Sequence, residues 1–142
     1  MIGCNGEDKG LPKVIFDSNF LFVPFQFHID IFDEIEALLG RFEPLILRPA
    51  LMEIEKLARK GSTKKQKAAL AALDVARRCR IIDVECEQVK SIDDLIVLAA
   101  QRLVCIVATN DAGLRRKLRE IGVPTIFVRK RQHLEIDGYA LK

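Results

Sequence analysis

A short apolar run that ends on an acid constrains this chain more than any other feature. Residues 14–16, Val-Ile-Phe, favour a strand buried on both faces, and Asp17 follows them directly. A second apolar run at 104–108 leads into the polar residues 109–111. The carboxyl ends of parallel strands share one edge of a sheet, where ligands bind in open α/β folds. Two such strands would therefore bring acidic side chains to the same edge.

Strand and helix patterns alternate along the rest of the chain. Short β-rich runs lie at 13–17, 45–47, 80–84, 104–109 and 125–128. Helical spacing of apolar residues is found at 28–39, from Pro49 to Gly61, and at 63–78, 91–102 and 114–121. This alternation predicts an α/β fold, a three-layer α/β/α sandwich around a five-stranded parallel sheet. Residues 134–136 would add a sixth strand at its edge.

Length and composition indicate one ordinary globular domain. The 142 residues are 49% hydrophobic and 30% charged, and no apolar run is long enough to span a bilayer. We expect a flexible lead-in over 1–12, without signal-peptide character, and a single domain over 13–142. Four scattered cysteines without a C-x-x-C pair suggest reduced thiols rather than a disulfide scaffold or a zinc site. We therefore expect a cytoplasmic protein.

The net charge of +3 is only mildly basic, but the basic residues are clustered. Clusters close to the expected sheet edge could contact the phosphates of a nucleic acid, although a solvated surface is the simpler explanation for any one residue. The candidates for such contacts are Lys60, Lys64, Lys65, Arg115 and Arg116.

Several acids are expected near the same edge, and each has a structural explanation of its own. Asp17 and Asp111 could cap the helices that follow them, and the Asp93-Asp94 pair suits the first turn of a helix after Ser91. Glu53 and Glu55 both flank the apolar stripe of their helix, so spacing alone does not choose between them.

Together these acids predict a centre for a hard metal ion. Carboxylates gathered without a cation repel one another and raise one another's pKa. Sites built only from oxygen ligands suit Mg²⁺ or Mn²⁺ rather than zinc. Such ions activate water and stabilise charge on phosphate, which is the chemistry of phosphodiester hydrolysis.

The chain resembles the PIN-domain family of metal-dependent ribonucleases from residue 13 to about residue 129. Four motifs carry the resemblance in the right order, supported by Gly122-Val123-Pro124 before the last strand. They are Asp17-Ser18-Asn19 after the first strand, Pro49 to Ile54 with Glu53, Asp93-Asp94 with Leu95 and Ala99, and Thr109-Asn110-Asp111. The second motif favours Glu53 over Glu55, and the third favours Asp94, with Asp93 a close second.

The resemblance implies an endonuclease that cuts RNA with one or two Mg²⁺ or Mn²⁺ ions. The implied catalytic and metal-binding residues are Asp17, Glu53, Asp94 and Asp111, with Asp93 beside them and with Asn19, Thr109 and Asn110 in support. The family contains VapC-type toxins of toxin–antitoxin pairs and rRNA-processing nucleases, so expected partners are RNA and either an antitoxin or a ribosome-biogenesis protein, without a membrane. Apolar residues in 28–39 would serve a homodimer or the core equally well.

Other hydrolase and binding folds fit less well. A haloacid-dehalogenase-like phosphatase needs a second aspartate where Asn19 stands. A receiver domain needs an acidic pair at the first strand, and a nucleotide-binding module needs a glycine-rich loop that this chain lacks. The remaining alternative is a catalytically silent PIN module that binds RNA or a protein partner.

Overall fold

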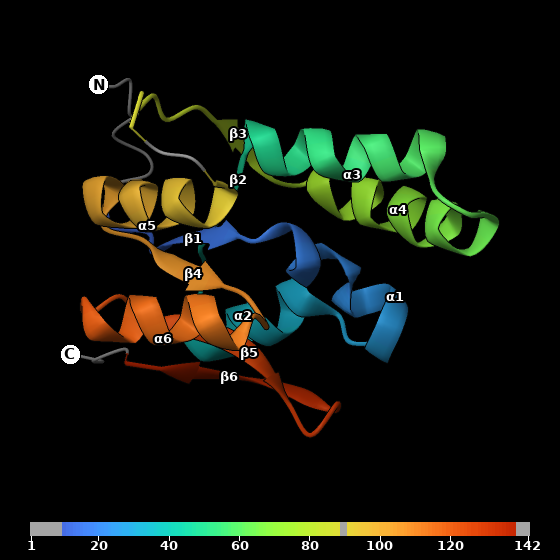
Figure 1. The fold of residues 1–142 in the computed structure, drawn as a ribbon. Coiled ribbons are helices and arrows are strands. Elements are labelled where there is room, and N and C mark those ends of the chain that lie inside the picture. Colours follow the sequence, from blue (N-terminus) through green and yellow to red (C-terminus); the bar gives the residue numbers. More distant parts are fainter. Residues whose placement is uncertain (1–9, 89–90, 139–142) are drawn as a thin grey trace.

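A computed structural model of the chain describes residues 10–88 and 91–138 (Figure 1). Its strands are β1 (Lys13–Phe16), β2 (Glu43–Leu47), β3 (Arg80–Ile82), β4 (Ile106–Ala108), β5 (Thr125–Arg129) and β6 (His133–Asp137). Its helices are the 3₁₀ helix η2 (Ser18–Phe22), α1 (Val23–Phe27), α2 (Ile31–Leu39), α3 (Arg48–Lys60), α4 (Thr63–Ala76), α5 (Ile92–Leu103) and α6 (Ala112–Glu120).

The strands form one six-stranded sheet in the order β3-β2-β1-β4-β5-β6. The first five are parallel, and β6 pairs antiparallel with β5 at the edge. The predicted parallel sheet and its additional edge strand are therefore confirmed. The order reverses between β1 and β4, which is the switch point where open α/β sheets bind ligands.

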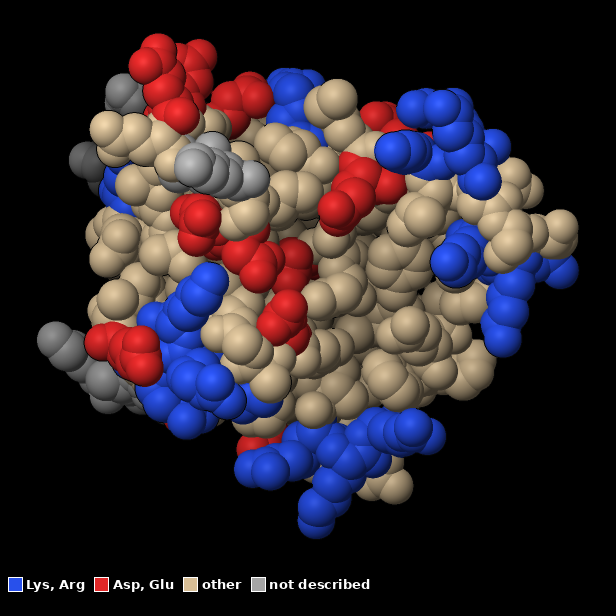
Figure 2. Space-filling model, in the orientation of Figure 1, with Lys and Arg blue, Asp and Glu red and all other residues tan. Residues whose placement is uncertain are grey.

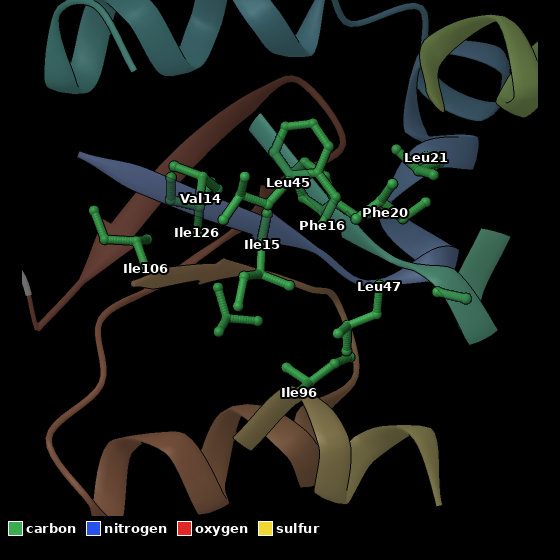
Figure 3. Packing of buried hydrophobic residues seen from close by; sticks show 14 of the residues in the cluster. Val14, Ile15, Phe16, Phe20, Leu21, Leu45, Leu47, Ile96, Ile106 and Ile126 are labelled. Carbon is green, nitrogen blue, oxygen red and sulfur yellow. The ribbon is translucent and has the colours of Figure 1, made fainter. Parts of the chain in front are cut away.

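The core fills both faces of the central strands. Val14, Ile15 and Phe16 of β1 have no exposed surface, as a strand between two helical layers requires. Figure 3 shows Ile96 of α5 reaching the sheet from one side, while Phe16 and Leu45 lie on the other. In Figure 1, α5 and α6 lie together on one side, and α3 and α4 extend as a pair beyond the carboxyl edge of β1.

The segment between β1 and β2 differs from its predicted structure. Residues 28–39 were expected to be one helix, but α2 begins only at Ile31, with the side chain of Asp30 accepting a hydrogen bond from the backbone of Asp33. His28 instead ends the additional helix α1 with a left-handed φ of 57°. The sequence pattern did not predict η2 and α1. The phenylalanines at 20, 22, 25 and 27 are spaced in a way that fits neither helix nor strand periodicity.

A tight turn joins α3 to α4. Gly61 donates its backbone N–H to the carbonyl of Leu57, and the Ser62 hydroxyl caps α4 by accepting from Lys65. A Cβ atom on Gly61 would lie only 2.7 Å from the Leu57 oxygen and 3.0 Å from Cβ of Lys65. The glycine is therefore needed for the close approach of the two helices.

The structure also bears on the predictions for the cysteines, for membrane-spanning segments and for the domain boundary. Cys79, Cys86 and Cys105 are free thiols, and burial raises the pKa of Cys79 to about 12 and that of Cys105 to about 11. No helix within residues 10–88 and 91–138 has the length and apolar character needed to cross a membrane. The expected lead-in over 1–12 falls mostly outside the described residues, so the domain boundary at residue 13 stays a prediction.

We expect Gly61→Ala to destabilise the protein by about 1–3 kcal/mol, because a methyl group there overlaps a backbone carbonyl that cannot move independently. Urea unfolding followed by circular dichroism measures the change. Lys67→Ala, which places the same residue on the exposed face of α4, is the control and should leave the free energy of unfolding nearly unchanged. Equal stability of the two variants would contradict the role given to Gly61.

Candidate metal-dependent active site

Asp17 lies at the carboxyl end of β1 and is only 5% exposed. Its Oδ1 accepts from the backbone N–H of Ser18 over 2.8 Å, and its Oδ2 accepts from the Thr109 hydroxyl over 2.7 Å. Burial, followed by the charges of Asp93 and Asp111, raises the pKa of Asp17, although the Thr109 and Ser18 hydrogen bonds oppose this. A carboxylate held under this electrostatic penalty is a candidate functional group.

Thr109 connects the two strands that meet at the switch point. The fully buried hydroxyl of this residue donates to Asp17 at the end of β1 and accepts from the backbone N–H of Asp111 after β4. A threonine hydroxyl can do both at once, because it carries one donor and two acceptor lone pairs. Thr109 therefore fixes the distance between the loops that carry Asp17 and Asp111.

Glu53 reaches the same region from α3. The Ser18 hydroxyl, next to Asp17, donates to Glu53 Oε1 over 2.9 Å. Glu55 lies near Arg48 instead, which also forms a bidentate ion pair with Asp83. The positions of the two glutamates therefore agree with the motif, which favoured Glu53 over Glu55 as the site residue.

The loop after β4 is ordered by side-chain contacts to its backbone. Asp111 caps α6 by accepting from the backbone N–H of Leu114, as its capping interpretation predicted, and its side chain also lines the cleft described below. Asn110 Oδ1 accepts from the backbone of Val128 on β5, and the Asn110 N–H approaches Asn19 Oδ1 at 3.5 Å. The two asparagines thus connect the loops that carry the acids. Asp111 caps α6 and lines the cleft at the same time.

The first turn of α5 brings Asp93, rather than Asp94, toward the other acids. Asp93 is half-buried, and burial, followed by the charge of Asp111, raises its pKa, with Glu53 adding to the effect. Asp94 is exposed, and its backbone N–H donates to the Ser91 hydroxyl in the expected cap. Since consecutive helical residues point about 100° apart, only one of the pair can face the site. Burial and charge therefore favour Asp93, against the sequence interpretation that preferred Asp94.

The donor set suits a hydrated divalent cation better than a closed metal cage. Within residues 10–88 and 91–138, no three histidine, cysteine or acidic side chains lie close enough together to hold an ion. Mg²⁺ commonly keeps several waters and uses only one or two carboxylates. Burial is the main cause of the raised pKa values of Asp17 and Asp93, and the charges of neighbouring carboxylates add to it. A cation bound near these carboxylates would offset both effects.

A cleft of about 690 Å³ opens beside the acids. Glu53 and Asp111 are among the residues that line it, and Phe22, Phe27 and Leu57 add apolar surface to the lining. In Figure 2, a row of acidic residues crosses the face of the molecule beside an open, uncharged surface. Lysines and arginines border that surface at the α3–α4 end and at the tip of the β5–β6 hairpin.

Only one of the five residues predicted to contact phosphate lines the cleft. Arg115 lines the cleft, with its guanidinium 3.6 Å from the centre of the Phe127 ring, and its Nε is buried without a hydrogen-bond partner among the described residues. The other four predicted residues are exposed and lie outside the walls of the cleft: Lys60, Lys64, Lys65 and Arg116. Lys130 and Arg131, which the sequence interpretation did not select, line the cleft directly.

A family model described as a PIN like domain matches residues 14–131. The chain belongs to this family. The match covers the elements from β1 to β5 except Lys13, the first residue of β1, and the acids of the site lie inside it. The resemblance that the sequence motifs suggested is confirmed.

Curated relatives and solved structures agree with this family. Ribonuclease VapC4 of Methanocaldococcus jannaschii is 34% identical over 129 residues, which are 89% of this chain and 97% of that protein. The rRNA-processing protein FCF1 of Saccharomyces cerevisiae is 35% identical over 82% of this chain, which spans 59% of FCF1. The structure of the PIN domain endonuclease Utp24 superposes with a TM-score of 0.71 at 29% identity, covering 89% of this chain and 92% of that one.

We expect the melting temperature of Asp17→Asn, compared with that of the wild type in the presence of EDTA, to rise by roughly a few degrees between pH 4 and pH 7, although the amide loses one of the two acceptor oxygens. The pKa of Asp17 is raised from 3.8 on folding, so the folded state binds the proton more tightly than the unfolded state. Ionisation therefore removes stability as the pH rises through the raised pKa, and the stability advantage of the asparagine variant should grow from pH 4 to pH 7.

Asp83→Asn is the control, because folding lowers the pKa of Asp83 whereas it raises the pKa of Asp17. The hydrogen bond from Arg48 lowers the pKa of Asp83, so its ionised form stabilises the fold, and that stability is lost as the pH falls through the lowered pKa. Differential scanning fluorimetry from about pH 2 to pH 7 compares the two variants with the wild type, because Asp83 titrates below 3.8 and Asp17 above it. A stability advantage of Asp17→Asn that shrinks as the pH rises would contradict the electrostatic account of the site.

Proposed function

We propose that this protein is a PIN-type endoribonuclease that hydrolyses RNA phosphodiester bonds with Mg²⁺ or Mn²⁺ bound at the acidic cluster. The observation that supports the proposal is that four acids from separate elements lie around the switch point of the sheet, near enough for their charges to raise the pKa of Asp17 and of Asp93. They are Asp17 after β1, Glu53 on α3, Asp93 on α5 and Asp111 before α6. The ribonuclease names of relatives that match nearly the whole chain support the same activity.

Each acid has a part in this proposal. Asp17 and Asp93, which repel one another without a cation, would hold the ion, and Asp111 and Glu53 would complete its water-mediated shell. Thr109 orients the Asp17 carboxylate, and Ser18 orients Glu53. When bound, the ion lowers the pKa of a water and stabilises negative charge on the phosphate. The protein supplies the fixed oxygen donors and a cleft beside them for the RNA chain.

The relatives suggest two alternative cellular roles for this protein, a VapC-type ribonuclease or an rRNA-processing protein. VapC4 stands for a ribonuclease of the toxin type, and FCF1 stands for rRNA processing. A partner antitoxin, a ribosome-biogenesis partner, a homodimer and a cytoplasmic location stay predictions. The site chemistry is the same in either role, because both need a metal-assisted cut in an RNA strand.

We expect the purified protein to cut RNA in Mn²⁺ or Mg²⁺ and to lose all cleavage in EDTA. A panel of single-stranded and structured RNAs, resolved on denaturing gels, provides the measurement. Products should carry internal cuts rather than shortened ends. Cleavage that persists in EDTA would overturn the metal-dependent proposal, and no cleavage in any metal would favour the silent RNA-binding module.

Two matched pairs of variants test the assigned acids. Glu53→Gln and Asp93→Asn should each reduce cleavage at least about 100-fold, because each removes a charge needed to hold or complete the metal site. Glu55→Gln and Asp94→Asn change the neighbouring acids by the same chemistry and should remain near wild type. Activity lost in Asp94→Asn and kept in Asp93→Asn would return the ligand role to Asp94.

A further inference from the structure

The tip of the β5–β6 hairpin has an unusual combination of backbone conformation and side chains. Lys130 and Arg131 both have positive φ, at 55° and 60°, and the N–H of Gln132 donates to the carbonyl of Arg129 across them. Positive φ at both central positions is the signature of a type I′ turn, which strongly prefers Asn-Gly. Long cationic residues are therefore poor choices for the stability of this turn. Residues held in such strained conformations are often functional.

The position of the two residues suggests what that function is. Lys130 and Arg131 are both exposed, and both line the cleft that also contains Glu53 and Asp111. Just below the tip, Arg129 forms an ion pair with Glu135 over 3.0 Å. Among the described residues, no ion pair includes Lys130 or Arg131. The hairpin thus neutralises the charge on its strands and presents two positive charges at its tip, beside the acids.

A single strand of RNA fits this arrangement. Its unpaired bases can contact the apolar lining residues Phe22, Phe27 and Leu57, while its phosphates contact the cations that also line the cleft. The acidic row occupies one side of the open surface and the hairpin tip another (Figure 2). A strand that runs across the cleft from the acids to the hairpin tip would bring its phosphates next to Lys130 and Arg131.

We propose that Lys130 and Arg131 form a phosphate clamp that holds a single-stranded RNA segment next to the acidic centre. This inference rests on RNA being the substrate. The clamp accounts for cations at two positions where the turn itself favours Asn-Gly. Arg115, on the same wall with its buried Nε, would continue this basic track toward Asp111.

The test replaces the turn with the sequence that its backbone prefers. The double variant Lys130→Asn/Arg131→Gly should melt at the same temperature as the wild type or a few degrees higher. Its affinity for a short labelled single-stranded RNA, measured by fluorescence anisotropy in EDTA, should fall about tenfold. The slope of log K against log salt should also decrease by about 1.4, since each contact to a single strand contributes about 0.7.

A second double variant controls for the loss of two charges. Arg41→Gln/Arg102→Gln removes two arginines that do not line the cleft. Arg41 lies before the amino end of β2, and Arg102 lies in the last turn of α5. RNA affinity and salt slope should stay near wild type in this protein. Lys130→Gln/Arg131→Gln keeps side-chain length without charge and should lose affinity like the Asn-Gly variant.

The outcomes separate this inference from the proposed function. Hairpin variants that bind RNA as tightly as the wild type, with an unchanged salt slope, would overturn the clamp even if the wild type cuts RNA in Mn²⁺. Hairpin-dependent RNA binding by a wild-type protein that never cuts RNA would support the clamp and remove the nuclease. Equal losses in the Arg41/Arg102 control would also overturn the clamp, because the effect would then reflect net charge alone.

Discussion

The pairing of β1 with β2 on one side and β4 on the other is the constraint on which the site depends. β1 lies at the centre of the sheet with its apolar side chains fully buried, so its carboxyl end has a fixed position. The Thr109 hydroxyl then joins the end of β1 to the loop after β4 through Asp17 and the backbone of Asp111. Without this pairing, Asp17 and Asp111 would not be held at the same edge of the sheet, near Glu53 of α3 and Asp93 of α5.

The same arrangement sets the stability of the cation-free fold against the proposed function of the acids. Asp17 and Asp93 are partly or largely buried near other carboxylates, and their raised pKa values mean that their ionised forms destabilise the cation-free fold. Capping bonds to Asp17 and Asp111 offset part of this, because each carboxylate also satisfies a backbone N–H at the start of a helix. These acids therefore have structural roles that do not exclude the chemical roles proposed for them.

Much of the fold and most of the candidate site could be predicted from local sequence. Buried strands such as 14–16 are recognisable because parallel strands between helical layers are continuously apolar. Their order along the chain limits the topology to right-handed crossovers, which places Asp17 and Asp111 at one edge. The short helices η2 and α1 could not be predicted in this way, because phenylalanines at mixed spacing give no single period.

Sequence alone determined the fold class, the family and the acids that end β1 and precede α6, because these depend on apolar periodicity and on residues adjacent to strand ends. Only the tertiary structure favoured Asp93 over Asp94, since the packing of α5 against the sheet sets which first-turn residue faces inward. It also brought Lys130 and Arg131 into the cleft, because the antiparallel pairing of β5 with β6 places their turn at the carboxyl end of β5. Such choices arise from the packing of whole elements, which no local pattern encodes.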